Sequence, residues 1–521
     1  MFLLQANTTS LFNLSDLLLI APALILTVCG CVALVMEVIL PYKKSKMSAY
    51  MALAGIALAI VSLYLQLAQM GGTYKIWGIA KLTPIDGFYG MVRIDGIAIL
   101  FQAIFLVAAA FAIAVSTRFL DIEGEQHGEY YALILFATVG MLFLGCGYDL
   151  ITLYISLELM ALTFYVLVAF TKREKRTNEA AMKYFLLGAF SSGILLYGIS
   201  LIYGITGSTN LGEIAIQIKQ IVLTSTSATS STGVSLRPLM VLGMISLAAG
   251  LFFKISAVPF HMWAPDAYEG APTSVTAFLS TGSKAASFAL FFRIFIAALG
   301  DMRADWAPVL GMVAAITILV GNWGAVTQEN SKRLLAYSSI SNAGYLLLGL
   351  IAGNEWGYKG LVIYLFVYVL MNMGAFGVII SLRRRGIIGD NVEDMTGLAQ
   401  KAPGMAFMMT VFMLSLGGLP VTGGFIGKLF LFGGLVQRAD ADGKSWYYWL
   451  AGWAIVNTVV SFYYYVRFIR VMYIGERVAD ARPLSLSRPL RASLVAALIG
   501  IIFVGIYPQP LINLVQRLVG P

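Results

Sequence analysis

The sequence predicts an all-α polytopic membrane protein of about 14 transmembrane helices. Three observations support this prediction. Hydrophobic residues make up 59% of the 521 residues, charged residues only 12%, and the apolar residues gather in long segments. A soluble domain carries about 25% charged residues. This composition therefore excludes a soluble enzyme, a disordered chain and a protein that binds nucleic acid.

Each expected span is a segment of about 20 mostly apolar residues, the length that crosses ~30 Å of hydrocarbon. The first seven spans are 17–40, 48–68, 96–116, 130–147, 149–170, 180–206 and 238–261. The other seven are 273–299, 306–326, 335–352, 358–381, 403–436, 446–475 and 490–514. Because the connections are short, we expect no soluble domain. The connection 224–233 is rich in Ser and Thr and is typical of a flexible external linker.

Basic residues predict the orientation of these spans. If the N-terminus lies outside, nineteen Lys and Arg residues fall in inner loops and ten in outer loops. Cytoplasmic loops carry the excess of Lys and Arg, so we expect both termini on the outer side. The N-terminus lacks the basic flank and small-residue cleavage site of a signal peptide, so we expect the first span to be retained.

Several ionisable residues lie inside spans, where each costs at least ~2.5–3.5 kcal/mol and is a functional candidate. Arg293 and Arg467 lie toward span ends, where long side chains can reach the interface. Lys183 lies one turn into its helix, beside a basic run, and either an interfacial or a relay role is open.

Three charges lie deeper in the apolar segments, and these are Glu158, Lys254 and Lys284. Burial raises the proton affinity of a carboxylate and lowers that of an amine, whereas pairing reverses both effects. A change of partner therefore changes which group holds the proton. The sequence leaves open a proton relay or a static buried ion pair.

Two spans contain a proline that interrupts the helix. Pro259 follows Lys254 closely, and Pro420 frees the carbonyl of Leu416 in a glycine-rich stretch that precedes Lys428. Interrupted helices in corresponding places of two halves point to a transport site. The alternative interpretation is that each proline only kinks its helix and has no role in transport.

The positions of the breaks predict two repeats. Spans four to eight and nine to thirteen each form a five-helix unit whose fourth helix is broken. Because five is odd, the second unit is inverted in the membrane. The predicted divisions are 1–128, 129–300 (first repeat), 301–478 (second repeat) and 479–521. The second unit has serines, AYSSISNAGYLLLGL, where the first has the helix of Glu158.

The sequence shows no redox or metal centre. Three cysteines are too few for an iron–sulfur cluster. The two histidines leave no bis-histidine haem pair inside the membrane, because His127 lies in a polar loop. His261 follows the first break, with Asp266 and Glu269 close behind, and an imidazole there can pass protons. A structural role for His261 is equally open.

Four strings carry a resemblance to a known family: NEAAMKYFLLGAFSSGILLYG, FHMWAPDAYEGAPTSVTAFLSTGSKAA, LLAYSSISNAGYLLLGL and LPVTGGFIGKLFLF. They resemble the N subunit of NADH:quinone oxidoreductase, respiratory complex I, and the similarity spans about residues 90 to 475. The resemblance implies fourteen helices with two inverted five-helix repeats. The chain ends soon after its last span, which is expected of the N-type rather than the L-type subunit with its lateral helix.

The resemblance also implies roles for residues of this chain. It implies that Glu158 pairs with Lys254, and that Lys284 and Lys428 continue the proton path. By the same resemblance Lys183 is a recurrent sixth-helix lysine, and His261 belongs to the connecting path. One departure is that Pro420 is followed by Val421, where relatives often have a second proline.

The leading hypothesis is a proton-translocating membrane subunit in which quinone reduction elsewhere in the complex switches the Glu158–Lys254 pair. The resemblance implies that NADH, FMN, iron–sulfur clusters and quinone bind to partner subunits, with no cofactor here. It implies a bacterial cell inner membrane, without excluding a plastid-type relative. The alternatives are a subunit of a cation/proton antiporter and a purely structural membrane subunit.

Overall fold

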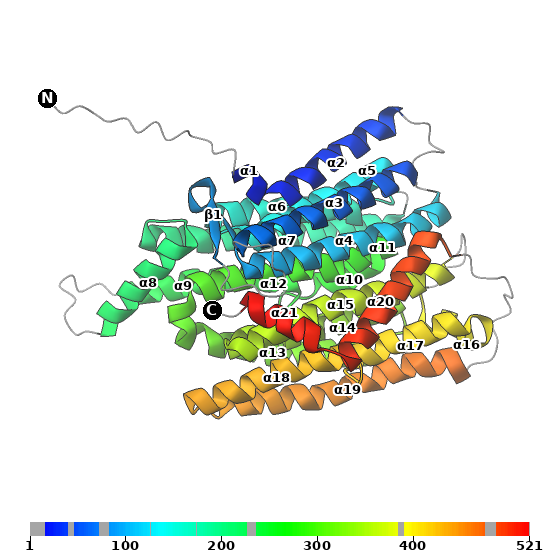
Figure 1. The fold of residues 1–521 in the computed structure, drawn as a ribbon. Coiled ribbons are helices and arrows are strands. Elements are labelled where there is room, and N and C mark those ends of the chain that lie inside the picture. Colours follow the sequence, from blue (N-terminus) through cyan, green and yellow to red (C-terminus); the bar gives the residue numbers. More distant parts are fainter. Residues whose placement is uncertain are drawn as a thin grey trace.

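The computed structural model describes residues 16–39, 46–71, 83–124, 127–172, 174–226, 236–383, 390–474 and 486–519. Its long helices run roughly side by side, with the hairpin β1–β2 and α8 toward one end and α16 toward the other (Figure 1). We call these the hairpin end and the α16 end. Most of the predicted linker, residues 227–233, lies outside the described residues.

The elements follow one another with short connections. The first helices are α1 (Asp16–Leu19), α2 (Ala21–Ile39), α3 (Lys46–Met70) and α4 (Gly96–Glu123). The next are α5 (Gly128–Cys146), α6 (Leu150–Val168), α7 (Lys175–Thr206), α8 (Leu211–Thr226), α9 (Arg237–Ile255), α10 (Trp263–Gly270), α11 (Thr273–Phe278) and α12 (Lys284–Phe291). Then come α13 (Arg303–Val326), α14 (Ser331–Ala352), α15 (Glu355–Leu382), α16 (Leu398–Lys401), α17 (Pro403–Gly417), α18 (Gly423–Asp442) and α19 (Trp446–Ile474). The last are α20 (Arg488–Ile506) and α21 (Gln509–Val519).

Short irregular elements complete the fold. The strands are β1 (Ile85–Gly87) and β2 (Val92–Ile94), the 3₁₀ turns are η2 (Phe88–Gly90), η5 (Gly300–Met302) and η6 (Val392–Met395), and the π-helical segments are η3 (Leu279–Ser283) and η4 (Phe292–Ala298). The two strands pair antiparallel. The sequence did not predict this hairpin or α8, because neither contains a long apolar segment.

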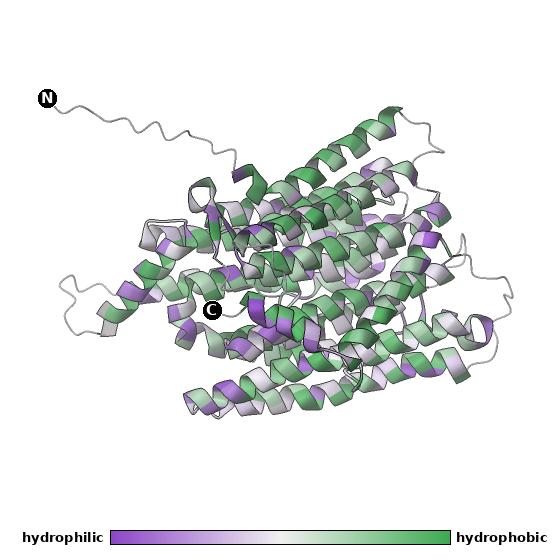
Figure 2. Ribbon diagram, viewed as in Figure 1, coloured by the Kyte–Doolittle hydropathy of each residue, from purple (hydrophilic) through white to green (hydrophobic). Residues whose placement is uncertain are grey.

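The chain is a polytopic, all-α membrane protein. Among the described residues, twelve helices are long and apolar enough to cross a membrane. Two further predicted spans, 403–436 and 446–475, coincide with the pair α17–α18 and with α19. Hydrophobic residues dominate the middle of the bundle, and hydrophilic residues gather toward the helix ends (Figure 2). This pattern is the one expected when the bilayer surrounds the middle of the bundle.

Two helices are interrupted as the sequence predicts. Between α9 and α10 the chain leaves the helix at Ser256, and between α17 and α18 it does so at Gly418. Val421 in the second break has φ +73°. A proline fixes φ near −65°, so a proline at position 421 could not adopt this conformation.

The second helices of the two predicted five-helix units, α6 and α14, begin alike. Asp149 and Asn330 cap α6 and α14 with their side chains, and each forms an antiparallel bridge, with Asn210 and Asn391 respectively. Each member of the second bridge lies 181 residues after its counterpart. The bridges lie at opposite ends of the bundle, which supports the predicted inverted repeat.

Candidate functional site

The predicted pair Glu158 and Lys254 lies between α6, α7 and α9. Lys254 is only 6% exposed, and its Nζ lies 3.4 Å from Oγ of Ser192 on α7. Glu158 lies within electrostatic reach of Lys254, but the two do not form an ion pair within hydrogen-bond distance in the part of the chain that the structure describes. Oε1 of Glu158 is buried and has no hydrogen-bond partner there. The lysine and the carboxylate therefore face each other without a fixed contact.

His261 lies in the break between α9 and α10, as predicted. Its ring is partly buried, and Nδ1 has no hydrogen-bond partner among the described residues. The indole of Trp263 closes the break by donating to the carbonyl of Phe253 at 3.0 Å. This bond joins the ends of α9 and α10, so the break next to Lys254 has a defined shape.

Lys284 connects the two units. It is 1% exposed and follows η3, a π-helical segment of the kind that occurs often at functional sites. Its Nζ donates to both the carbonyl and Oγ of Ser339 on α14. Tyr368 of α15 donates to the same Oγ at 2.9 Å. A lysine of the first unit is thus bound by a serine of the second.

A run of hydroxyl and amide groups begins at the neighbouring residue, Ser338, and extends through the second unit. We call it the Ser–Asn–Tyr chain, and its members are Ser338, Asn342, Tyr364, Tyr465, Tyr464, Asn322 and Tyr345. Tyr364 donates to Asn342 at 2.6 Å, and Tyr464 donates to Asn322 at 3.1 Å. All seven side chains are buried. The sequence did not predict the Ser–Asn–Tyr chain.

Lys428 lies at the far end of the Ser–Asn–Tyr chain. Its Nζ lies 4.8 Å from the ring centre of Tyr345 and donates to the carbonyl of Leu416 at 3.0 Å. This is the carbonyl that Pro420 was expected to free. The backbone break therefore supplies a hydrogen-bond acceptor for a lysine that is 3% exposed.

Lys183 lies apart from the buried groups. Its side chain is 47% exposed and pairs with Glu179 at 2.9 Å and with Asp266 of α10 at 3.0 Å. Arg333 of α14 also reaches Asp266, at 3.2 Å. Cations from α7 and α14 thus hold α10, the helix that follows the break.

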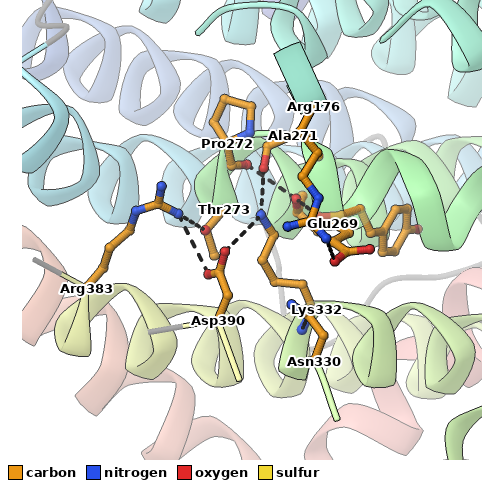
Figure 3. A network of polar contacts seen from close by, with 12 residues as sticks. Arg176, Glu269, Ala271, Pro272, Thr273, Asn330, Lys332, Arg383 and Asp390 are labelled. Carbon is orange, nitrogen blue, oxygen red and sulfur yellow. Dashed lines mark hydrogen bonds and ion pairs between the residues drawn. The ribbon is translucent and has the colours of Figure 1, made fainter. Parts of the chain in front are cut away.

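A second contact set holds the end of α10 (Figure 3). Lys332 of α14 donates from Nζ to the carbonyl of Ala271 at 2.8 Å, and Asp390 lies 4.0 Å from the same Nζ. A cation at a helix C-terminus interacts favourably with the helix dipole. The predicted span 335–352 leaves Lys332 outside the helix, but α14 begins at Ser331. Lys332 is 2% exposed, because Asn330 caps α14 and brings Lys332 into its first turn.

Arg293 was expected to reach the interface, and this expectation is wrong. Arg293 is 2% exposed and binds Asp95, at the start of α4, with both ends of its guanidinium at 2.6 and 2.9 Å. Burial raises the pKa of Asp95, but the charge and hydrogen bonds of Arg293 outweigh it and hold the pKa below its ordinary value. Arg467 donates to the carbonyl of Val326 at 3.0 Å.

In the described ranges, no three His, Cys, Asp or Glu side chains lie close enough together to hold a metal ion. The buried groups that the structure brings together are amines, one carboxylate, hydroxyls and amides. These groups exchange protons rather than electrons. Ser339 and the tyrosines could have been noticed in the sequence only as polar residues inside apolar spans, and that signal is weak for uncharged groups.

Comparisons with known proteins place this geometry in a family. Residues 147–452 match the family model described as NADH:quinone oxidoreductase/Mrp antiporter, TM. The chain is 47% identical to NADH-quinone oxidoreductase subunit N 2 of Solibacter usitatus, over 97% of this chain and 98% of the relative. It is 46% identical to subunit N 1 of Koribacter versatilis, over 98% and 97%.

Solved structures agree with these relatives. A chain of respiratory complex I from Thermus thermophilus with bound aureothin is 31% identical, covers 94% of this chain and 98% of its own length, and has a TM-score of 0.75. A chain of the Mrp complex from a Dietzia species is 20% identical, with a TM-score of 0.77 and coverage of 97% and 98%. This second likeness shows the fold alone.

Proposed function

This chain belongs to the subunit N family of NADH-quinone oxidoreductase and is a proton-translocating membrane subunit, and we propose that its buried charges carry the protons. The observation that supports this proposal most directly is the unfixed pair of Glu158 and Lys254. A static ion pair would place the two groups in direct contact. A pair held close without contact can exchange its proton when a neighbour moves.

The proposed path begins at the α16 end. Lys183 and Asp266 are partly exposed there and can take a proton from water. His261 follows in the break, with an unpartnered ring nitrogen that can accept and release a proton. Glu158 and Lys254 come next, at the middle of the bundle.

The path then crosses into the second unit. Lys284 passes its proton to the hydroxyl of Ser339, and the Ser–Asn–Tyr chain extends toward Lys428. Hydroxyls can donate and accept at the same time, so they can relay a proton without holding a net charge. Lys428 then releases the proton toward the hairpin end.

In this proposal, quinone reduction and proton movement are coupled by a change of electric charge. Quinone reduction in another subunit changes the charge near Glu158, which favours or disfavours the ammonium form of Lys254. We place NADH, FMN, iron–sulfur clusters and quinone in partner subunits of the complex. We place the hairpin end on the outer side of a bacterial inner membrane, with both termini on that side.

Charge-removing variants in the assembled complex test the relay. In vesicles, Glu158→Gln and Lys254→Met should lower proton uptake per NADH oxidised by at least about tenfold, because each removes a group that holds the proton in transit. Lys219→Met on the exposed surface of α8 is the matched control and should change nothing.

Other results would favour the alternatives. Normal pumping by fully assembled Lys254→Met complexes would overturn the relay. Loss of assembly with unchanged pumping per remaining complex would indicate a structural subunit. Sodium- or potassium-dependent proton exchange without NADH would indicate an antiporter.

A further inference from the structure

Asn372 on α15 is a buried amide that the proposed proton path does not use. Its side chain is 1% exposed. Oδ1 and Nδ2 are both buried, and neither forms a hydrogen bond with another residue in the described ranges. A buried amide without partners is costly, and native proteins rarely keep one without a reason. A second arrangement of the neighbouring groups, in which the amide has a partner, would supply that reason.

The hydroxyl of Tyr368 lies beside this amide. Tyr368 precedes Asn372 by four residues, so the two side chains share one face of α15, and they are close enough to interact. In the structure the Tyr368 hydroxyl instead donates to Oγ of Ser339 on α14, at 2.9 Å. A hydroxyl has a single proton to donate. Tyr368 can therefore bind either Ser339 or Asn372 with that proton, but not both at once.

The Ser339 hydroxyl has no acceptor capacity left in this arrangement. A serine hydroxyl carries one proton and two lone pairs. Lys284 donates to one lone pair and Tyr368 donates to the other. The serine's own proton is left for the hydroxyl of Tyr268 on α10, whose oxygen lies 3.5 Å from Oγ. Three neighbours thus hold the Ser339 hydroxyl, and it cannot turn.

We propose that Asn372 is the alternative acceptor for the Tyr368 hydroxyl and thereby releases Ser339. In the second arrangement the hydrogen bond from Tyr368 to Ser339 breaks, and one from Tyr368 to Oδ1 of Asn372 forms. The proton stays on Tyr368 throughout. One lone pair of Ser339 becomes free, so its hydroxyl can turn. Because a hydroxyl that relays protons must turn between transfers, this exchange limits how fast the junction at Lys284 conducts. The inference rests on the proposed function, since it assigns a role within the proton path.

The packing around Tyr368 suits an exchange that moves only a proton. The Tyr368 ring is fully buried, its centre lies 6.3 Å from that of Tyr364, and Nζ of Lys284 lies 6.0 Å from the same centre. The π-helical segment η3, directly before Lys284, packs against α15. These contacts fix the ring. A rotation of the hydroxyl proton about the bond between ring carbon and oxygen changes its acceptor without moving the ring.

Proton uptake per NADH oxidised, measured on the assembled complex in vesicles, tests this exchange. Asn372→Leu keeps a branched side chain but removes the acceptor, so Tyr368 stays on Ser339. We expect proton uptake to fall about tenfold. Assembly and thermal stability should be unchanged or higher, because an apolar group replaces an unpartnered buried amide. Ser381→Ala is the matched control and should pump normally, since the buried Ser381 hydroxyl donates to the carbonyl of Val378 within α15.

A second substitution distinguishes the release of Ser339 from a structural role of the amide. Tyr368→Phe removes the group that holds Ser339. Added to Asn372→Leu, it should restore most of the proton uptake that Asn372→Leu alone loses. If the amide acted only through packing, the double variant would pump no better than the single one.

Three results would overturn the exchange. The first is normal pumping by assembled Asn372→Leu complexes, and the second is a double variant that pumps no better than Asn372→Leu. The third is lower thermal stability or lost assembly of Asn372→Leu, which would show that the amide is bonded in the resting arrangement. Lys254→Met separates these results from failure of the proposed function. If Lys254→Met stops pumping and Asn372→Leu does not, the exchange fails and the proton path stands. Normal pumping by both variants would reject the path itself.

Discussion

Glu158 on α6 and Ser339 on α14 lie 181 residues apart, the same offset that separates the two bridges of α6 and α14. Their surroundings differ. The carboxylate has a buried oxygen without a hydrogen-bond partner among the described residues and a lysine nearby but not bound. The serine is bound by Lys284 and by Tyr368.

Under the proposed path, this difference gives the two units different roles. In the first unit a pair of charges would hold the proton on either member, because no short contact fixes it. In the second unit neutral hydroxyls and amides would pass the proton along to Lys428, which donates to the carbonyl of Leu416. In this proposal the charge pair responds to a distant redox event and the neutral groups conduct without responding. The predictions below probe this contrast, from the largest expected effect on pumping to the smallest.

Making the units alike should stop pumping. Ser339→Glu places an acid beside Lys284, where the two would form a direct buried ion pair that holds the proton. We expect proton uptake per NADH oxidised to fall by at least about tenfold. Ser339→Ala keeps the backbone carbonyl as a partner of Lys284 and should have a smaller effect. Full pumping by assembled Ser339→Glu complexes would contradict the contrast between the units.

Removing one hydroxyl from the Ser–Asn–Tyr chain should slow conduction. Tyr464→Phe keeps the ring and removes the hydroxyl that donates to Asn322. We expect pumping to fall by roughly tenfold or less, since a relay group contributes about 10²–10⁴ and water can replace part of it. Tyr447→Phe, a buried tyrosine at the hairpin end of the same helix, is the control. Equal effects of both variants would show that the Ser–Asn–Tyr chain is not part of the proton path.

Loosening α10 should have a moderate effect. Lys332→Met leaves the carbonyl of Ala271 without its donor and removes one of the two cations near Asp390, which Arg383 also approaches at 3.7 Å. We expect the complex to lose about 1–3 kcal/mol of stability and part of its pumping, because α10 adjoins the break beside Lys254. Lys332→Arg should restore both properties if Lys332 acts by positioning α10. Rescue of stability without rescue of pumping would contradict a positioning role.

A fixed ion pair should matter for stability alone. Asp95→Asn leaves Arg293 buried without its anion, which costs about 3–5 kcal/mol, while pumping per assembled complex stays normal. Because the folded-state pKa of Asp95 lies below its ordinary value, ionised Asp95 stabilises the fold above the unfolded pKa. That contribution is lost as the pH falls through the folded-state value. Thermal melts from neutral to acid pH should therefore show wild type and Asp95→Asn converging at the acid end.

The spans, both breaks and the deep charges could be predicted from the sequence, because each depends on local chemistry. A run of about 20 apolar residues is most favourable when it spans the bilayer. A proline inside a helix leaves the carbonyl four residues before it without its hydrogen bond, wherever the helix lies. The carbonyl of Leu416, which Pro420 was predicted to free, accepts a hydrogen bond from Lys428, a partner that the sequence did not predict. The relay roles of all six residues stay predictions, as do the boundaries of the repeats; the six are Glu158, Lys183, Lys254, His261, Lys284 and Lys428.

The sequence by itself determined that this is a polytopic membrane protein. It also identified the few ionisable residues inside the spans whose charge needs a partner within the protein. Tertiary structure alone decided their partners, because hydrogen bonds between buried groups join helices that are far apart in the sequence. It brought Lys284 to Ser339 and Arg293 to Asp95, and it buried Lys332. A charge in an apolar span can be recognised from the residues next to it in the sequence. The group that compensates this charge comes from another helix, and the nearby sequence gives no signal for it.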